Sequence, residues 1–234
     1  MNKYDVIIIG AGPSGIFCAY ELMRQKPDMK VLMIEKGRSI EKRQCPKRTT
    51  KVCVGCKPCS ITTGFAGAGA FSDGKLSLSP DVGGTLPEIL GYEKAEELIK
   101  EADNIYLKFG ADEKVYGIDD YEAIERIRAK AIRANLKLIE CPIRHLGTEE
   151  GYKIYTRLQE HLLASGVEIK FMTMVQDIII EDGVAKGVVT DKEETYYADE
   201  IVSGIGREGS SWFEGICKNH GIKTQNGTVD VGVR

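Results

Sequence analysis

Tyr4-Asp5-Val6-Ile7-Ile8-Ile9-Gly10-Ala11-Gly12-Pro13-Ser14-Gly15 stands near the start of a chain of 234 residues and predicts its fold class. Val6–Ile9 is a short run of β-branched residues, which is typical of a strand buried on both faces. The glycine pattern Gly-x-Gly-x-x-Gly follows, and then Ile16–Arg24, whose apolar residues recur with helical spacing. A strand, a glycine turn and a helix in this order form the context of a dinucleotide-binding fingerprint.

The three glycines of the fingerprint have separate predicted roles. Gly10 permits the tight turn, Gly12 lets a pyrophosphate approach the backbone, and Gly15 lets the helix pack closely on the strand. Free N–H groups and the positive end of the helix dipole then face the phosphates. Pro13 and Ser14 lie inside this turn and belong to the same predicted binding site.

A second strand is predicted at Lys30–Ile34, and it ends in Glu35. That carboxylate follows Gly10 by 25 residues, close to the spacing at which an acidic group accepts the ribose hydroxyls of the adenosine half. It would also repel a 2′-phosphate, which disfavours NADP. Lys36 is included in the predicted site. The alternative, a surface carboxylate behind a purely structural turn, is disfavoured by the complete order of elements.

Composition and charge exclude several function classes. Hydrophobic residues make up 42% of the chain, charged residues 29%, and the net charge is −3, so neither nucleic acid nor an anionic membrane is an expected partner. No apolar run approaches a membrane span, and the N-terminus has the pattern of a strand and not of a signal peptide, so we expect a cytoplasmic protein. The basic pairs Lys42-Arg43 and Lys47-Arg48 lack interleaved aromatic residues and predict a solvated loop.

The stretch Gly64–Lys75 is rich in glycine and alanine. Such a composition indicates backbone pressed against a flat or phosphorylated ligand. The alternative is a flexible linker, but linkers of this kind are rich in serine and lack phenylalanine.

A helical insertion is predicted between residues 86 and 145. Two helices with a break at Gly91 account for Leu86–Phe109, and a third, Tyr121–Ala134, is capped by Asp119 or Asp120. A short strand is predicted at Leu136–Glu140.

The remaining chain returns to mixed periodicity. A helix is predicted from Thr148 through Ala164, followed by strands at Val167–Met172, Val175–Glu181 and Val184–Thr190. Asp182-Gly183 predicts a hairpin turn between the last two strands, and Thr195–Ala198 extends them into a meander. A strand with a glycine turn at Asp199–Arg207, a helix at Trp212–His220 and a last strand at Val229–Arg234 complete the prediction. Trp212 and Phe213 are assigned to the core.

This order of elements resembles the FAD-binding oxidoreductases of the glutathione-reductase-like superfamily. Two stretches, Cys53-Val54-Gly55-Cys56-Lys57-Pro58-Cys59 and Gly67-Ala68-Gly69-Ala70-Phe71-Ser72-Asp73-Gly74-Lys75-Leu76, are similar to those of one branch, the "FAD-dependent dehydrogenase" proteins. The resemblance extends over essentially the whole chain. It implies an α/β, Rossmann-like FAD/NAD(P)-binding domain with a central parallel sheet, a small antiparallel β-meander and the helical insertion.

The resemblance also implies a set of cofactor contacts. Gly10, Gly12 and Gly15 would face the pyrophosphate, and Glu35 the adenosine ribose. Val175, which follows Met174, would contact the adenine, and Gly204 and Gly206 would form the later glycine turn near the cofactor. The implied contacts along the flavin are Gly67, Gly69, Ala70 and Lys75. Lys75 could also stabilise the reduced flavin ring, and it is the one catalytic candidate, with an ordinary surface lysine as the alternative.

Four of the seven cysteines, Cys45, Cys53, Cys56 and Cys59, lie within 15 residues of one another. They could hold an iron–sulfur cluster or a structural zinc ion. A Cys-x-x-Cys pair could instead be a dithiol that exchanges electrons with flavin, and free thiols in a mobile loop are the fourth interpretation.

The expected domain organisation is a FAD-binding domain over residues 1–220, with the cysteine-rich loop at 45–60, and the start of a truncated substrate domain over 221–234. The expected function is that of an FAD-dependent oxidoreductase acting on a small organic substrate, with an electron donor or acceptor such as NAD(P)H. The alternatives are an NAD-binding oxidoreductase and a non-catalytic redox sensor or electron carrier. The oligomeric state is left open.

Overall fold

A computed structural model of the chain describes residues 3–71, 74–225 and 227. The strand predicted at Val229–Arg234, and with it most of the predicted second domain, lies outside these residues. Among the described residues no helix is both long and apolar enough to span a lipid bilayer.

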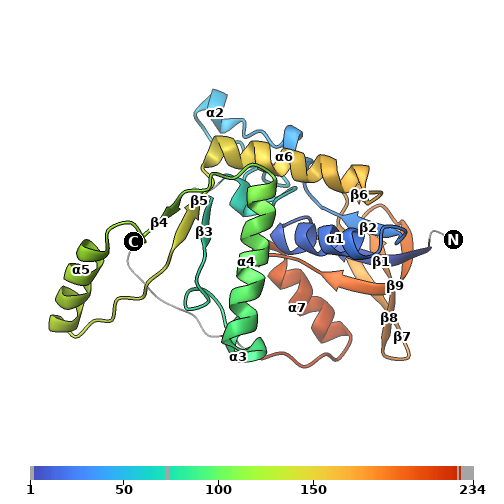
Figure 1. Cartoon of the computed structure of the whole chain (residues 1–234). Helices are drawn as coiled ribbons and strands as arrows, with labels where there is room; N and C mark the ends of the chain where they lie inside the picture. Colours follow the sequence, from blue (N-terminus) through green and yellow to red (C-terminus); the bar gives the residue numbers. More distant parts are fainter. Residues whose placement is uncertain (1–2, 72–73, 226, 228–234) are drawn as a thin grey trace.

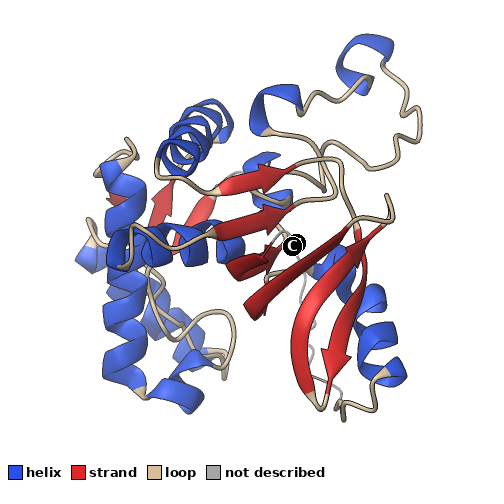
Figure 2. Cartoon of the chain, turned by 90° about the vertical axis from the view of Figure 1, so that its right-hand side faces the viewer, coloured by secondary structure: helices blue, strands red, loops and turns tan. Residues whose placement is uncertain are grey.

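A six-stranded sheet with the order β6-β2-β1-β9-β8-β7 forms the centre of the molecule (Figures 1 and 2). Its parallel half comprises β6 (Glu168–Lys170), β2 (Val31–Ile34), β1 (Lys3–Ile9) and β9 (Thr195–Ser203). The side chains of Val6–Ile9 and of all four β2 residues are buried, as expected for strands covered on both faces. The predicted central parallel sheet is therefore confirmed.

The antiparallel half consists of β7 (Val175–Glu181) and β8 (Val184–Thr190), with the predicted bounds. Asp182 and Gly183 connect them with φ angles of +50° and +76°, which the predicted hairpin turn requires. The separation of a meander strand at Thr195–Ala198 from a strand beginning at Asp199 is wrong. Both belong to β9, which pairs with β8 at its start and with β1 along most of its length, so one strand joins the two halves of the sheet.

Helices cover both faces of the sheet. On one face, α1 (Pro13–Gln25) and α6 (Thr148–Ala164) bury Ile16 and Leu158 in the cluster that contains Ile8. On the other face, α7 (Ser210–Asn219) buries Ile216 in the cluster that contains Ile7. Successive residues of β1 thus point into opposite cores, as the twofold periodicity of a strand demands.

The helical insertion contains α3 (Leu86–Leu90), α4 (Tyr92–Lys108) and α5 (Tyr121–Arg133), and the predicted break at Gly91 is confirmed. A three-stranded antiparallel sheet, β3 (Lys75–Ser77), β5 (Ile143–His145) and β4 (Val115–Tyr116), forms its base. The strand predicted at Leu136–Glu140 is wrong, because those residues are not in a strand and the side chains of Leu136 and Ile139 are exposed. The strand lies instead at β5, whose backbone pairs with β3 on one side and with β4 on the other.

Short helical turns complete the loops: η1 (Ile40–Lys42), α2 (Lys47–Thr50), η2 (Ala68–Phe71) and η3 (Arg207–Gly209). Two of them, η2 and η3, approach the carboxyl ends of β1, β2 and β9, where the candidate site lies.

Candidate functional site: a dinucleotide cleft

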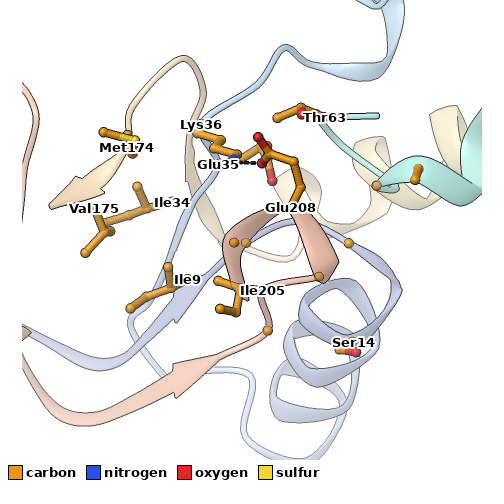
Figure 3. A pocket seen from close by; sticks show the side chains of 18 of the residues that line it. Ile9, Ser14, Ile34, Glu35, Lys36, Thr63, Met174, Val175, Ile205 and Glu208 are labelled. Carbon is orange, nitrogen blue, oxygen red and sulfur yellow. Dashed lines mark ion pairs between the residues drawn. The ribbon is translucent and has the colours of Figure 1, made fainter. Parts of the chain in front are cut away.

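A cleft of about 470 Å³ opens at the carboxyl ends of β1, β2 and β9 (Figure 3). This is the edge at which open α/β sheets bind their ligands. The residues of the predicted site that line it are Gly10, Gly12, Pro13, Ser14, Glu35, Lys36, Gly67, Val175, Gly204 and Gly206. Segments far apart in the sequence thus meet at one place.

The first and third glycines of the fingerprint are required by the protein's own packing. Gly10 has a φ of +98°, and a β-carbon there would lie 3.0 Å from the carbonyl oxygen of Gly204. A β-carbon at Gly15 would lie only 2.0 Å from the carbonyl oxygen of Gly10. These contacts match the predicted roles of the tight turn and of close helix–strand packing.

Gly12 is different, because no protein atom requires a glycine there. Its φ of −74° is open to any residue, and a β-carbon at this position would find its nearest protein atom, the Gly204 oxygen, at 4.0 Å. Gly12 nevertheless lines the cleft, so a side chain would project into the space that a ligand would occupy. No protein atom requires a glycine at position 206 either, because a β-carbon there would have no protein atom within 4 Å.

Backbone donors face this space from the start of α1. Among the described residues, the N–H groups of Gly12, Ser14 and Gly15 have no protein acceptor, whereas the Ala11 N–H is bonded to Glu35. Unsatisfied N–H groups together with the helix dipole favour an anion at this point. The residues present therefore fit a pyrophosphate.

Glu35 is 6% exposed and lies in the wall of the cleft. One carboxylate oxygen accepts from the Ala11 N–H at 2.8 Å and the other from the Gly37 N–H at 2.7 Å. These bonds fix the carboxylate, and each oxygen retains a further lone pair for a hydroxyl donor. The predicted ribose contact is compatible with this arrangement.

Thr62, Thr63, Gly64, Gly67 and Ala68 form a second wall of the cleft, which we call the threonine–glycine wall. The wall is held from behind by Arg43, which is 2% exposed. The prediction of a solvated loop is therefore wrong for Arg43, because its guanidinium is enclosed by backbone carbonyl groups of the segment that contains this wall.

An ion pair between Lys36 and Glu208 crosses one side of the cleft (Figure 3). Lys36 follows β2 and Glu208 belongs to η3, so the pair connects two of the segments that bound the site. Burial lowers the pKa of Lys36, and the nearby Glu35 partly opposes this shift. Both side chains keep substantial contact with solvent, so the pair adds little to stability.

Apolar side chains line the part of the cleft beside β7, where Met174, Val175, Ile205 and Trp212 meet. The indole N–H of Trp212 donates to the carbonyl oxygen of Gln176 at 2.9 Å, which holds the ring in place. Trp212 packs against the core cluster, as predicted, and it also lines the cleft. The assignment of Phe213 to the core is wrong, because its side chain is exposed.

Four residues of the predicted site are not in the cleft lining. Gly15 serves helix packing, Ala70 is 4% exposed within the core, and Gly69 is exposed in η2. Lys75 is an exposed residue of β3, in the smaller sheet. The predicted roles of Gly69, Ala70 and Lys75 along the flavin are not supported by these positions and stay predictions.

The cysteines are all free thiols. In the part of the chain that the structure describes, no three cysteine, histidine or acidic side chains come together as a metal-binding group, so Cys45, Cys53, Cys56 and Cys59 are not assembled as ligands. Hydrogen bonds from the backbone of Thr62 and Ile61 lower the pKa of the exposed Cys59 thiol, with a further contribution from Arg43.

Sequence reasoning missed the two threonines of the wall, Thr62 and Thr63, together with other lining residues: Ile9, Ile34, Thr173, Ile205, Arg207, Glu208 and Gly209. Ile9 and Ile34 could have been found, because they are the last residues of the two predicted parallel strands. Thr62 and Thr63 belong to no motif, and only the tertiary structure reveals them, whereas Gly64, Gly67 and Ala68 lie in the stretch that the sequence predicts to press against a ligand.

Solved structures of low sequence identity share this fold. Glycine oxidase from Bacillus cereus ATCC 14579 is 18% identical, with a TM-score of 0.51 over 94% of this chain and 58% of that chain. L-proline dehydrogenase from P. horikoshii is 17% identical, with a TM-score of 0.52 over 96% of this chain and 57% of that chain. The chain therefore spans little more than half the length of these proteins.

A local sequence match joins the chain to thiamine thiazole synthase from Coprinopsis cinerea, with 52% identity over 33 residues, which is 14% of this chain and 10% of that protein. A family model described as FAD dependent oxidoreductase (DAO) matches residues 5–213. This match covers the central sheet and the cleft and supports FAD as the cofactor. The resemblance inferred from the sequence is thereby confirmed, and the chain belongs to the FAD-dependent oxidoreductase family.

Proposed function

We propose that this chain is the FAD-binding part of an enzyme that oxidises or reduces a small organic molecule. The observation that carries the proposal is the glycine turn: Gly12 leaves open space on the cleft side, beside N–H groups without protein acceptors among the described residues. A buried carboxylate, Glu35, stands in the same cleft. Together these features suit the adenosine diphosphate half of FAD.

When bound, FAD supplies the hydride or electron transfer, and the chain supplies binding, orientation and exclusion of water. In the proposal the fingerprint N–H groups hold the pyrophosphate and Glu35 holds the ribose. The backbone at Val175 contacts the adenine, and the threonine–glycine wall runs toward the flavin. The apolar surface of Met174 and Trp212 keeps water from the adenine end.

Family membership implies a small-molecule substrate and an electron acceptor or donor. We propose NAD(P)H as one such donor and the cytoplasm as the location. Both rest on the sequence alone.

A second candidate is an NAD-binding oxidoreductase, because the ADP half is common to NAD and FAD and the same cleft would hold either. The family match favours FAD. Absorbance distinguishes the two cofactors, since oxidised flavin absorbs at about 450 nm and NAD does not.

The test is a visible spectrum of the purified chain, followed by titration with FAD monitored by flavin fluorescence. We expect a yellow protein or tight uptake of added FAD. Glu35→Gln should weaken FAD binding by about tenfold or more, because an amide NH₂ would face the N–H donor of Ala11 or Gly37 and leave one buried group unpaired.

Glu168→Gln is the matched control, since Glu168 lies on β6, is exposed and does not line the cleft. It should bind FAD as the unchanged chain does. A chain that shows no flavin band and takes up no FAD contradicts the proposed function. Uptake of NAD without FAD would favour the second candidate.

A further inference from the structure

Arg43 places a charged group in the interior directly behind the cleft. Its Nε donates to the carbonyl oxygen of Ser60 at 3.0 Å, and one terminal nitrogen donates to that of Ile61 at 2.7 Å. The other terminal nitrogen donates to the carbonyl oxygens of Phe65 and Gly67 at 2.5 and 2.7 Å. One guanidinium therefore binds both ends of the segment 60–67.

No ion pair joins Arg43 to any carboxylate that the structure describes. The Phe71 ring lies 4.7 Å from the guanidinium carbon, so carbonyl dipoles and an aromatic face replace a counter-ion. Burial lowers the pKa of Arg43 to about 10, while the nearby Glu35 and Cys59 act in the opposite direction. The side chain is thus charged at neutral pH, and a buried charge of this kind is kept only where its hydrogen bonds are made.

The segment that Arg43 binds is pressed against the fingerprint turn. The Ala66 N–H donates to the Ala11 carbonyl oxygen at 2.7 Å, and Ala66 is fully buried. A β-carbon at Gly67 would lie 3.4 Å from the Cα of Gly12. Displacing the segment would therefore move the wall that stands beside the predicted pyrophosphate position.

The direction of the Gly67 carbonyl has a consequence for the next peptide N–H. A trans peptide holds its C=O and N–H on opposite sides. Because the Gly67 carbonyl points to Arg43, the Ala68 N–H is turned away from Arg43, and Ala68 lines the cleft.

We propose that Arg43 is a positioning residue for the cofactor: by gathering the carbonyl groups of residues 60–67 it sets the threonine–glycine wall against the fingerprint turn and orients the Ala68 N–H for the bound dinucleotide. This inference rests on the proposed function, that the cleft holds FAD. No contact between Arg43 and the cofactor is required.

The test compares Arg43→Met, which keeps the aliphatic bulk and removes the donors, with the unchanged 234-residue chain. FAD should bind about tenfold or more weakly, because several charge-assisted hydrogen bonds that shape the wall are lost. Bound flavin should show an altered visible circular dichroism spectrum. In the FAD-free chain, amide hydrogen exchange over residues 60–68 should become faster.

Arg144→Met is the matched control. Arg144 is a second buried arginine, 4% exposed, but it pairs with Asp103 and lies on β5, outside the cleft lining. Its replacement should lower the melting temperature and leave the FAD dissociation constant and the exchange at 60–68 unchanged. Arg43→Lys keeps the charge but not the fork of donors, so it should bind FAD with an intermediate affinity, and it serves if Arg43→Met does not fold.

Two outcomes would overturn the inference: Arg43→Met folds, binds FAD like the unchanged chain and shows unchanged exchange at 60–68, or Arg144→Met weakens FAD binding equally. Failure of the unchanged chain to bind FAD would instead refute the proposed function. In that case the exchange comparison alone decides whether Arg43 holds the wall.

Discussion

A side-chain carbon added at Gly15 would lie 2.0 Å from the Gly10 carbonyl oxygen, whereas one added at Gly12 would find its nearest protein atom at 4.0 Å. Both glycines belong to the same motif, yet only Gly15 is required by the fold. The space beside Gly12 belongs to the cleft. The two positions therefore separate folding from binding.

We expect Gly15→Ala to lower the free energy of unfolding by at least about 1 kcal/mol, because the backbone must move to admit the methyl group. Gly12→Ala should change it by less than about 1 kcal/mol, since its backbone conformation is ordinary, but should abolish detectable FAD binding. Urea denaturation and fluorescence titration of each variant check the two effects. If Gly12→Ala destabilises the chain as much as Gly15→Ala, the space beside Gly12 is not a ligand site.

Among the elements, α5 is held mainly by its own local contacts. None of its residues is buried, and Tyr121, Ile127 and Ile132 are more than half exposed. Figure 1 shows α5 at the end of an arm that reaches away from the central sheet. A helix of this length has little intrinsic stability in water without packing, so its capping contact is expected to matter more than in a packed helix.

Asp120 provides that cap, since its carboxylate accepts from the Ala123 N–H at 2.8 Å. Asp120→Ala should destabilise α5 by about 0.5–2 kcal/mol and speed amide exchange in residues 121–133 by about 2- to 30-fold. The melting temperature of the whole chain should not change, because α5 buries no side chain. Asp119→Ala is the control, since Asp119 is also exposed but does not cap the helix; equal effects of both variants would rule out the cap.

Elements could be predicted from the sequence where the pattern is local. The sequence predicts the strands Val175–Glu181 and Val184–Thr190 with their observed bounds, because alternation and an Asp-Gly turn specify a hairpin without other information. The continuity of β9 could not be predicted, since it depends on a change of pairing partner from β8 to β1. The strand Ile143–His145 likewise depends on partners that are distant in sequence.

At the scale of the whole molecule, the same distinction applies to the candidate site. Gly10, Gly12 and Glu35 could be predicted because their spacing is fixed by one strand–helix–strand unit. The sequence predicts a solvent-exposed Arg43, because nothing near this residue in the chain shows that residues 60–67 fold back around it. A buried charge satisfied by non-local carbonyl groups leaves no periodic signal.

Three helical segments meet at His161, near the end of α6. Its ring lies 5.4 Å from that of Tyr20 on α1 and 5.3 Å from that of Phe109, which follows α4. Burial lowers the pKa of His161, and the nearby ammonium of Lys108 adds to the shift. The folded chain therefore favours the neutral ring more than the unfolded chain does.

The stability of the whole chain should consequently depend on pH through His161. Above the unfolded pKa of about 6.5 the preference for the neutral ring contributes fully, and it is lost as the pH falls from there toward the lower folded pKa, because the unfolded chain takes up the proton first. Lowering the pH from about 7.5 to about 5.5 should therefore lower the urea midpoint of the unchanged chain by more than that of His161→Phe. The phenylalanine ring keeps the aromatic contacts and cannot titrate. His145→Phe removes an exposed histidine that lies outside this cluster and should show the same fall as the unchanged chain. An identical pH dependence in His161→Phe would show that the packing of the three helical segments is indifferent to the charge of this ring.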